Sequence, residues 1–376
     1  MVKLTPPMGW NSWNTFGENI NEAMICEMAD VMAESGLKEK GYEYLVIDDC
    51  WSLKERDEKE RLVPDPEKFP HGMKAIADYV HAKGLKFGMY SCAGNLTCAG
   101  YPGSFEHEFL DAETFAEWGV DFLKYDYCYH SPIIHGKYLY RRMGLALENC
   151  GREILFSACS WGNDETHAWI KETGASMWRS TGDIFDTWDS VKDLVTQQDK
   201  LHPYNGVGCF NDMDMLIVGM HGNGNVGLAG CTDQQYRTHY AIWALLGSPL
   251  MIGCDLRTMD EATKETLMND EMIRINQDPL GSQPIRLSTP YGNDNIRIYA
   301  RNLANGDLAI GLFNMSGERA KATFNLDEVG LPFSTGRTLQ MREVWTGNEV
   351  LVKNATHIEE LEPYGCSVYR AKVVKL

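Results

Sequence analysis

Two carboxylates, Asp126 and Asp183, lie where short apolar stretches of the chain end, and both are candidates for chemistry. Residues two apart in a strand point the same way, so Lys124 and Asp126 should share a face. Because a nearby ammonium favours the ionised carboxylate, we expect the pKa of Asp126 to be low, as a carboxylate nucleophile requires. A plain ion pair at the strand end is the alternative.

Asp183 follows Arg179 by four residues and is a candidate proton donor. Donation near neutral pH requires its pKa to rise by about 2 units from ~3.9. Nearby Trp rings and a second carboxylate would raise that pKa, whereas pairing with Arg179 would lower it. The alternative is a helix N-cap, a common role for Asp. One ionised and one protonated carboxyl group together suit the hydrolysis of a glycosidic bond.

Asp48 and Asp49 are adjacent at the end of another apolar stretch. Neighbouring strand residues point to opposite faces, so both reach one ligand only if the chain turns there. They are either two acceptors for sugar hydroxyls, or one inward acid and one loop cap. A metal site would need further ligands at recognisable spacing, which the sequence lacks, so we expect no metal.

A repeating unit positions these residues, in which an amphipathic helix ends near a glycine and a short apolar strand follows. Eight such strands, among them 9–13, 154–158, 206–210 and 250–252, alternate with helices over residues 1–282. This alternation predicts a (β/α)8 TIM barrel, in which the C-terminal ends of the strands build the active site. Helices are expected near residues 25–36, 73–83, 112–118, 137–149, 190–200, 233–246 and 261–275.

The pattern changes to short alternating strands from residue 283 to residue 376. Strands at 295–301, 308–313, 320–324, 339–343 and 367–372, with a turn at 291–293, predict an antiparallel β-sandwich. We interpret this second domain as a structural companion of the barrel.

Gly222, Gly224 and Gly227 match the glycine pattern of dinucleotide-binding folds. That fold requires a helix to open at the glycines, whereas the next predicted helix begins near Asp233. We therefore expect no nicotinamide or other cofactor, and predict that residues 220–232 form a mobile loop over the pocket.

Composition excludes several classes of partner. The net charge of -18 repels nucleic acid and anionic lipid, so neither is expected to bind. No apolar run is long enough to span a membrane, and no signal-peptide pattern is visible, which predicts a cytoplasmic location. The 11 cysteines show no zinc-binding spacing. The oligomeric state is left open, a homo-oligomer included.

Five motifs in order resemble family 27 glycoside hydrolases, which are α-galactosidases and α-N-acetylgalactosaminidases. They are PPMGWNSW at 6–13, IDDCW at 47–51, LKYD at 123–126, WRSTGDI at 178–184 and NDMDM at 211–215. The resemblance implies a barrel followed by an antiparallel β-domain, hydrolysis by double displacement with retention, a small-molecule galactoside substrate, and neither cofactor nor metal.

The resemblance also implies a role for each matching residue. Asp126 would be the nucleophile and Asp183 the acid/base. The remaining residues would bind the sugar: Asp48 and Asp49 at O4 and O6, Lys124 and Arg179 at ring hydroxyls, Asp214 at the far side, and Trp13, Ser160 and Trp161 around the pocket.

The chain departs from the family pattern at Ser160, where many relatives carry Glu beside the 2-substituent of the sugar. Relatives that accept N-acetylgalactosamine carry Ser there and Ala three residues on, where this chain has Asn163. We predict an exo-acting α-galactosidase for raffinose-type oligosaccharides. The alternatives are an α-N-acetylgalactosaminidase, a β-L-arabinopyranosidase and a catalytically inactive sugar-binding protein.

Two family disulfides can be compared with this chain. Cys50 is present, but Glu18 stands at the position where secreted relatives have its partner cysteine, so that bridge should be absent. Cys98 and Cys128 match the second family pair, but a reducing compartment argues against a bridge, so this pairing is left open.

Overall fold

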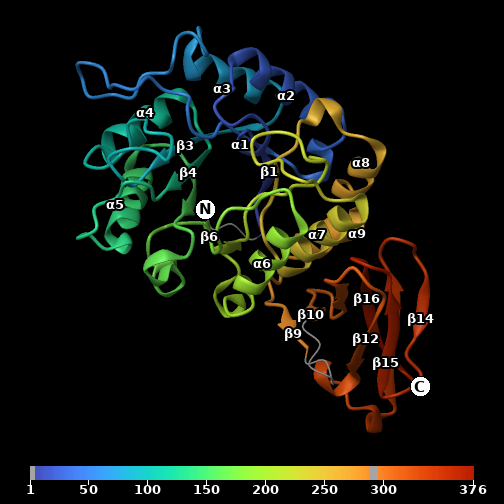
Figure 1. The fold of residues 1–376 in the computed structure, drawn as a ribbon. Helices are drawn as coiled ribbons and strands as arrows, with labels where there is room; N and C mark the ends of the chain where they lie inside the picture. Colours follow the sequence, from blue (N-terminus) through green and yellow to red (C-terminus); the bar gives the residue numbers. More distant parts are fainter. Residues whose placement is uncertain (1–4, 288–294) are drawn as a thin grey trace.

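A computed structural model describes residues 5–287 and 295–376; the turn predicted at 291–293 lies outside them. Figure 1 shows two parts, a larger one in which helices surround a ring of strands and a smaller one made of strands. Within the described ranges, no helix combines the length and the apolar composition that crossing a membrane requires.

Eight parallel strands form the curled sheet of the larger part, in the order β7-β6-β5-β4-β3-β2-β1-β8. The sheet closes where Leu216, beyond β7, bridges Ile252 of β8. The predicted TIM-like fold is therefore confirmed. The strands are β1 (Met8–Asn11), β2 (Tyr44–Val46), β3 (Lys86–Cys92), β4 (Phe122–Asp126), β5 (Leu155–Cys159), β6 (Met177–Arg179), β7 (Phe210–Asp212) and β8 (Leu250–Ile252).

The first strand is shorter than predicted, because the side chain of Asn11 accepts the backbone N–H of Trp13 and turns the chain into a helix. The helix predicted over 261–275 is two helices, because the side chain of Asn269 caps a new start. The helices are α1 (Trp13–Phe16), α2 (Glu22–Glu34), α3 (Gly72–Ala82), α4 (Glu108–Trp118), α5 (Gly136–Asn149), α6 (Trp188–Gln198), α7 (Asp233–Leu246), α8 (Glu261–Leu267) and α9 (Asp270–Asn276).

The smaller part is antiparallel, as predicted. A six-stranded sheet of order β14-β13-β16-β11-β10-β9 and a two-stranded sheet, β12-β15, enclose a separate apolar core. Its strands are β9 (Ile285–Arg286), β10 (Ile296–Asn302), β11 (Leu308–Asn314), β12 (Ala320–Asn325), β13 (Arg337–Glu343), β14 (Glu349–Leu351), β15 (Thr356–Leu361) and β16 (Cys366–Lys375).

The two parts contact each other through α6, the turn beyond it and α7, whose Thr238 donates to the carbonyl of Tyr364. Trp188 donates its indole N–H to the carbonyl of Met315, and Asp199 pairs with Arg297 and accepts the hydroxyl of Tyr299. The position of the domain boundary, between residues 282 and 283, stays a prediction.

Candidate active site

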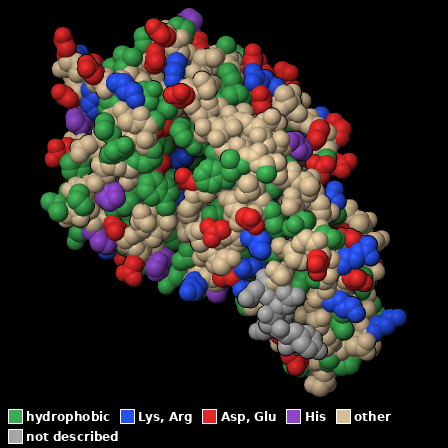
Figure 2. Space-filling model, viewed as in Figure 1, with side chains coloured by type: hydrophobic (Ala, Val, Ile, Leu, Met, Phe, Trp, Pro, Cys, Tyr) green, Lys and Arg blue, Asp and Glu red, His purple; other side chains and the backbone are tan. Residues whose placement is uncertain are grey.

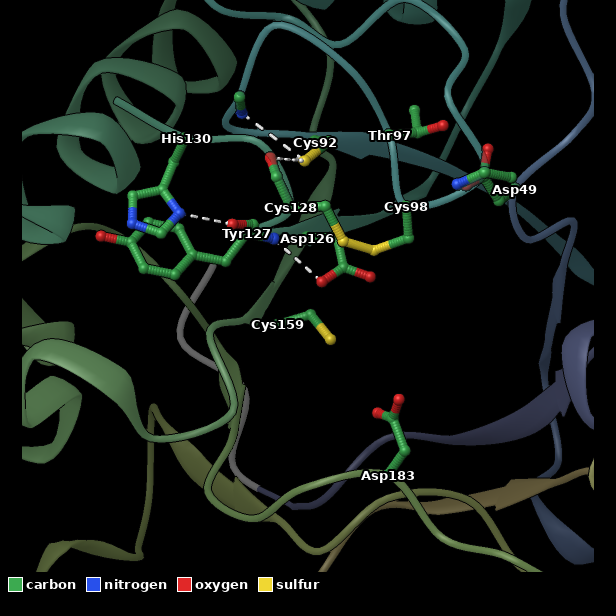
Figure 3. The surroundings of a disulfide bond; sticks show 12 residues. Asp49, Cys92, Thr97, Cys98, Asp126, Tyr127, Cys128, His130, Cys159 and Asp183 are labelled. Carbon is green, nitrogen blue, oxygen red and sulfur yellow. Dashed lines mark hydrogen bonds between the residues drawn. A yellow bond between two sulfur atoms is a disulfide. The ribbon is translucent and has the colours of Figure 1, made fainter. Parts of the chain in front are cut away.

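The C-terminal ends of β4 and β6 bring the two predicted carboxylates to one side of the barrel. Figure 3 shows the carboxylates of Asp126 and Asp183 directed toward one another, with Cys159 to one side between them. The charge of Asp183 is among the causes that raise the pKa of Asp126, so the two groups lie within electrostatic reach. On the molecular surface the barrel part has a hollow, with hydrophobic side chains gathered along one side (Figure 2).

Asp126, the last residue of β4, is held by two donors. Its Oδ1 accepts the backbone N–H of Tyr127 at 2.8 Å, and its Oδ2 accepts the hydroxyl of Tyr90 at 3.1 Å. Burial raises its pKa to about 6, against the opposing charge of Lys124. The expected low pKa is therefore wrong, because removal from water outweighs the nearby ammonium.

Lys124 pairs with a different carboxylate. Its Nζ lies 2.8 Å from Oδ2 of Asp48, and the same oxygen accepts the side-chain amide of Asn11 at 2.7 Å. Asp48 is only 2% exposed, so this pair stands at the floor of the site, inside the barrel. The ammonium thereby links the end of β4 to the residues that follow β2.

Asp49 turns away from Asp48 and binds backbone. Its two oxygens accept the N–H groups of Cys50 at 2.7 Å and Ala99 at 3.0 Å, and burial raises its pKa. In this arrangement Asp48 is the inward acid and Asp49 caps a loop. Asp49 thus fixes the loop after β3, which also carries Cys98.

Cys98 and Cys128 form a disulfide with Cα atoms 5.1 Å apart. It joins the loop after β3 to the segment after β4, and lies next to Asp126 in Figure 3. Cys50 is free, as predicted. Disulfides persist in oxidising compartments and are rare in the cytosol. The bridge and the predicted cytoplasmic location therefore argue in opposite directions, and the location stays a prediction.

Asp183 lies on an irregular segment beyond β6, and its side chain is 64% exposed to solvent. Arg179 donates to its Oδ1 at 2.8 Å. Partial burial raises the pKa of Asp183, but the charge and hydrogen bond of Arg179 prevail and lower it. The helix-cap alternative for Asp183 is wrong, because Thr187 caps α6.

Arg179 also pairs with Asp214, whose Oδ1 lies 2.9 Å from its Nη1. Asp214 has a left-handed backbone, with φ of 75°, and its Oδ2 accepts the N–H of Ile184 at 2.7 Å. Burial raises the pKa of Asp214. This carboxylate therefore connects the strand ends of β6 and β7 and holds the residue next to Asp183.

The remaining predicted residues differ in accessibility. Ser160 is fully buried, and its hydroxyl lies 2.7 Å from that of Thr166 rather than on the pocket surface. Trp161 is half-buried, with a left-handed φ of 55° and its ring 6.5 Å from that of Tyr127. Trp13 is half-buried at the start of α1.

The sequence-based site omitted Asn11, Tyr90, Cys159 and Asp212. Asp212 accepts the N–H of Asp214 at 2.9 Å, and burial raises its pKa to about 6. Asn11, Cys159 and Asp212 end strands that already supplied a predicted residue or motif, whereas Tyr90 lies within β3, which supplied none. Position near the C-terminal end of a barrel strand is the signal that would have found all four. A small cavity inside the barrel is lined by Asn11, Phe122, Lys124, Ser157, Met177, Arg179, Asp212, Asp214, Met215 and Met251.

The glycine loop, residues 220–232, is anchored rather than free. Its Asn225 and Val226 N–H groups donate to the carbonyls of Thr15 and Asn14, both at 3.0 Å, and Gly222 N–H donates to Asp186 at 2.7 Å. The prediction of a mobile loop over the pocket is corrected accordingly: hydrogen bonds fix it between α1 and the segment after β6.

Comparisons with known proteins agree with this geometry. The family model for alpha galactosidase A matches residues 5–278, and that for the alpha galactosidase C-terminal beta sandwich domain matches residues 293–371. An alpha-galactosidase of Cyamopsis tetragonoloba is 44% identical over 366 residues, covering 97% of this chain and 85% of the relative.

Two further relatives are similar over most of their length. Alpha-galactosidase I from Mortierella vinacea has a solved structure with a TM-score of 0.91 and 34% identity, covering 98% of this chain and 97% of the other. An alpha-N-acetylgalactosaminidase of Gallus gallus is 41% identical, covering 91% of this chain and 87% of the relative. The chain belongs to glycoside hydrolase family 27, among its α-galactosidases.

Proposed function

We propose that the chain releases terminal α-linked galactose with retention of configuration, using Asp126 as nucleophile and Asp183 as acid/base. The observation that carries this is the pair of carboxylates directed toward one another in Figure 3. Asp126 ends β4, and Asp183 follows the end of β6. Retention requires the two groups to lie about 5–5.5 Å apart with the sugar between them. Trp13, Asp48, Lys124, Arg179 and Asp214 would bind the sugar, and Asp49 would hold the loop beside it.

The reaction would have two displacements. In the first, an oxygen of Asp126 bonds to C1 of galactose while the bond from C1 to the leaving oxygen breaks, and Asp183 gives that oxygen its proton. In the second, water bonds to C1, Asp183 takes the proton of that water, and the bond from C1 to Asp126 breaks. Each carboxylate returns to its starting state.

The empty site has Asp183 ionised at neutral pH, since Arg179 lowers its pKa. We infer that the sugar supplies the change that proton donation needs. Galactose hydroxyls that accept from Arg179 would weaken its bond to Asp183, and the bound substrate would exclude water. Both effects favour the neutral carboxyl group, so its pKa would rise in the complex.

Raffinose-type oligosaccharides are the proposed substrates. The second candidate activity, on α-N-acetylgalactosaminides, is favoured by Ser160 in place of the Glu of many relatives. The burial of Ser160 against Thr166 weakens that support. Side-by-side kcat/KM values on the two p-nitrophenyl sugars decide between them, with a clear preference for galactose expected.

The central test is Asp126→Ala. Turnover should be abolished, and azide should partly restore it on p-nitrophenyl α-galactoside by forming β-galactosyl azide. Full activity in this variant, or an azide product of α configuration, would overturn the assignment of the nucleophile.

A further inference from the structure

The residues that connect Asp183 to α6 have no regular structure. Residues 182–185 lie between β6 and α6. Three of their backbone N–H groups donate to side chains: Gly182 to Gln197 Oε1 at 3.2 Å, Ile184 to Asp214 at 2.7 Å and Phe185 to Ser190 Oγ at 2.9 Å. Asp126, by contrast, ends a paired strand, and two donors hold its carboxylate. The acid/base candidate therefore depends on what anchors its segment.

Asp186 is the buried end of that segment. Its side chain is fully buried, and the hydroxyl of Tyr236 lies 2.9 Å from each of its oxygens. The N–H groups of Gly222 and Cys231 donate to it at 2.7 and 3.2 Å. Among the described residues no Lys or Arg forms an ion pair with it. A buried carboxylate is costly unless it is hydrogen-bonded, and neutral donors from two elements supply those bonds.

The backbone of Asp186 is held by the same glycine loop. Its N–H donates to the carbonyl of Val226 at 3.1 Å, its carbonyl accepts the N–H of Gly230 at 3.1 Å, and it forms a parallel bridge with Gly227. The glycine loop therefore encloses residue 186 through main chain and side chain together.

The glycine at 224 allows the loop to reach the other side of the pocket. Gly224 has a φ of +85°, and a Cβ there would lie 2.7 Å from the Cα of Thr15 and 3.0 Å from the carbonyl of Asn14. Only glycine permits so close an approach to the helix that begins with Trp13. The glycine pattern thus serves packing between two walls of the pocket, not a nucleotide phosphate.

We propose that Asp186, with Tyr236 and the glycine loop, is a positioning residue for proton donation by Asp183, an inference that rests on the proposed function. A general acid must come within hydrogen-bond reach of the leaving oxygen, about 2.6–3.2 Å. The segment from Asp183 to Asp186 has no strand pairing along its length to set that distance. The buried anchor at Asp186 therefore sets it together with the bond from Ile184 to Asp214.

The test compares two leaving groups. In Asp186→Asn, the new side-chain NH2 group meets the donors of Gly222, Cys231 and Tyr236, so these groups repel one another. In Tyr236→Phe, the hydroxyl donor to Asp186 is lost. For both variants, kcat/KM should fall on raffinose, whose sugar leaving group needs the proton, by about tenfold, a part of the ~10²–10⁴-fold that a general acid contributes. On p-nitrophenyl α-galactoside, whose leaving group needs little protonation, the fall should be at most about threefold.

The ratio of the two kcat/KM values is independent of how much enzyme is folded, so a purely structural role leaves it unchanged. Tyr236→Phe, the milder variant, decides the matter if Asp186→Asn does not fold. The matched control is Asp278→Asn, since Asp278 is a buried carboxylate that accepts the N–H groups of Leu280 and Ala304 away from the site. Its ratio should equal that of the wild type.

Asp183→Asn separates failure of this inference from failure of the proposed function. A large ratio change in Asp183→Asn with none in the Asp186 and Tyr236 variants would overturn the positioning role and leave Asp183 as the acid. An unchanged ratio in Asp183→Asn itself would overturn the acid/base assignment. A ratio change in the Asp278 control would show that the ratio reports general damage, which also overturns the inference.

Discussion

The two carboxylates of the site are held in opposite ways. Asp126 ends a strand that pairs on both sides, and its side chain is 6% exposed with donors to both oxygens. Asp183 lies in an irregular segment, is 64% exposed, and its carboxylate accepts a bond from Arg179. The sheet thus fixes the position of the proposed nucleophile, whereas the neighbours of its segment fix the position of the proposed acid/base.

This difference extends to charge. Burial raises the pKa of Asp126 to about 6, and Arg179 lowers that of Asp183. In the empty site both groups are therefore mainly ionised near pH 7. In the proposed mechanism, Asp126 is already ionised before substrate arrives, as a nucleophile must be, whereas Asp183 must gain a proton when substrate binds.

The largest expected effect comes from Asp126→Asn. We expect kcat to fall by more than the ~10²–10⁴-fold attributed to a general acid, because the covalent step is lost. The protein should also become more stable. The folded pKa of Asp126 is about 6 against its ordinary 3.8, so stability declines as pH rises from 3.8 to 6 and the deficit is complete at pH 7.

Replacing that charge should therefore increase the free energy of unfolding at pH 7 by about 1–3 kcal/mol. Urea unfolding at pH 7 and pH 4 measures this. The gain should vanish at pH 4, where the wild-type carboxyl group is protonated in the folded protein. A loss of stability at pH 7 would show that burial is not what raises the pKa.

The next largest effect is expected from Asp183→Asn. On raffinose, kcat/KM should fall by about 10²–10⁴-fold, the usual contribution of a general acid. Azide added to this variant should give α-galactosyl azide, because the vacated base side is the side from which water attacks. Identification of the product by NMR is the measurement, and a β-configured azide would exchange the roles of the two carboxylates.

The pH dependence of the wild type should show a smaller change. Since Asp126 must be ionised, kcat/KM on p-nitrophenyl α-galactoside, whose leaving group needs little help from Asp183, should decline on the acid side with a midpoint near 6. Below that midpoint the decline should approach about tenfold per pH unit. Lys124 lowers the pKa of Asp126, so Lys124→Gln should move the midpoint to higher pH. A shift to lower pH would contradict the stated cause.

The smallest effect on activity is expected from Cys98→Ala combined with Cys128→Ala. The disulfide spans 30 residues, and loss of such a bridge destabilises by about 2–4 kcal/mol. Because Tyr127 and Tyr90 still hold Asp126, kcat should change little. Denaturant unfolding beside kinetics at 25 °C checks both parts. An equal stability with and without reductant in the wild type would show that the bridge contributes nothing.

The sequence predicted the barrel, the antiparallel second domain and the positions of Asp126 and Asp183 relative to strands. Strand ends are visible as apolar runs that stop at polar residues, and this signal is local. The hydrogen-bond and ion-pair partners of these side chains come from distant parts of the sequence, and no local pattern identifies them. Lys124 shares a face with Asp126 but pairs with Asp48, 76 residues earlier in the chain. The pKa of Asp126 depends on burial by the whole barrel, which periodicity does not report.

The glycine loop illustrates the same limit. Its spacing is that of a phosphate-binding motif, and sequence context excluded a nucleotide because no helix opens there. Gly224 instead permits a close approach to Thr15 in α1, far away in sequence, whereas Gly222 and Gly227 lie against backbone of their own loop. Ser160 is similar, since only the folded chain shows that Thr166 lies against its hydroxyl.

The closing seam of the barrel explains how Asp214 comes to face Arg179. Beyond Asp212 the chain contacts β8 at the bridge between Leu216 and Ile252. Between Asp212 and Leu216, side chains bind the backbone: Ser248 accepts the N–H of residue 213, and Trp243 donates to the carbonyl of residue 214. A continuous ladder would hold Asp214 extended, which excludes its φ of 75°. A variant in which this eighth pairing were completed would have a more regular barrel, in which Asp214 no longer faced Arg179.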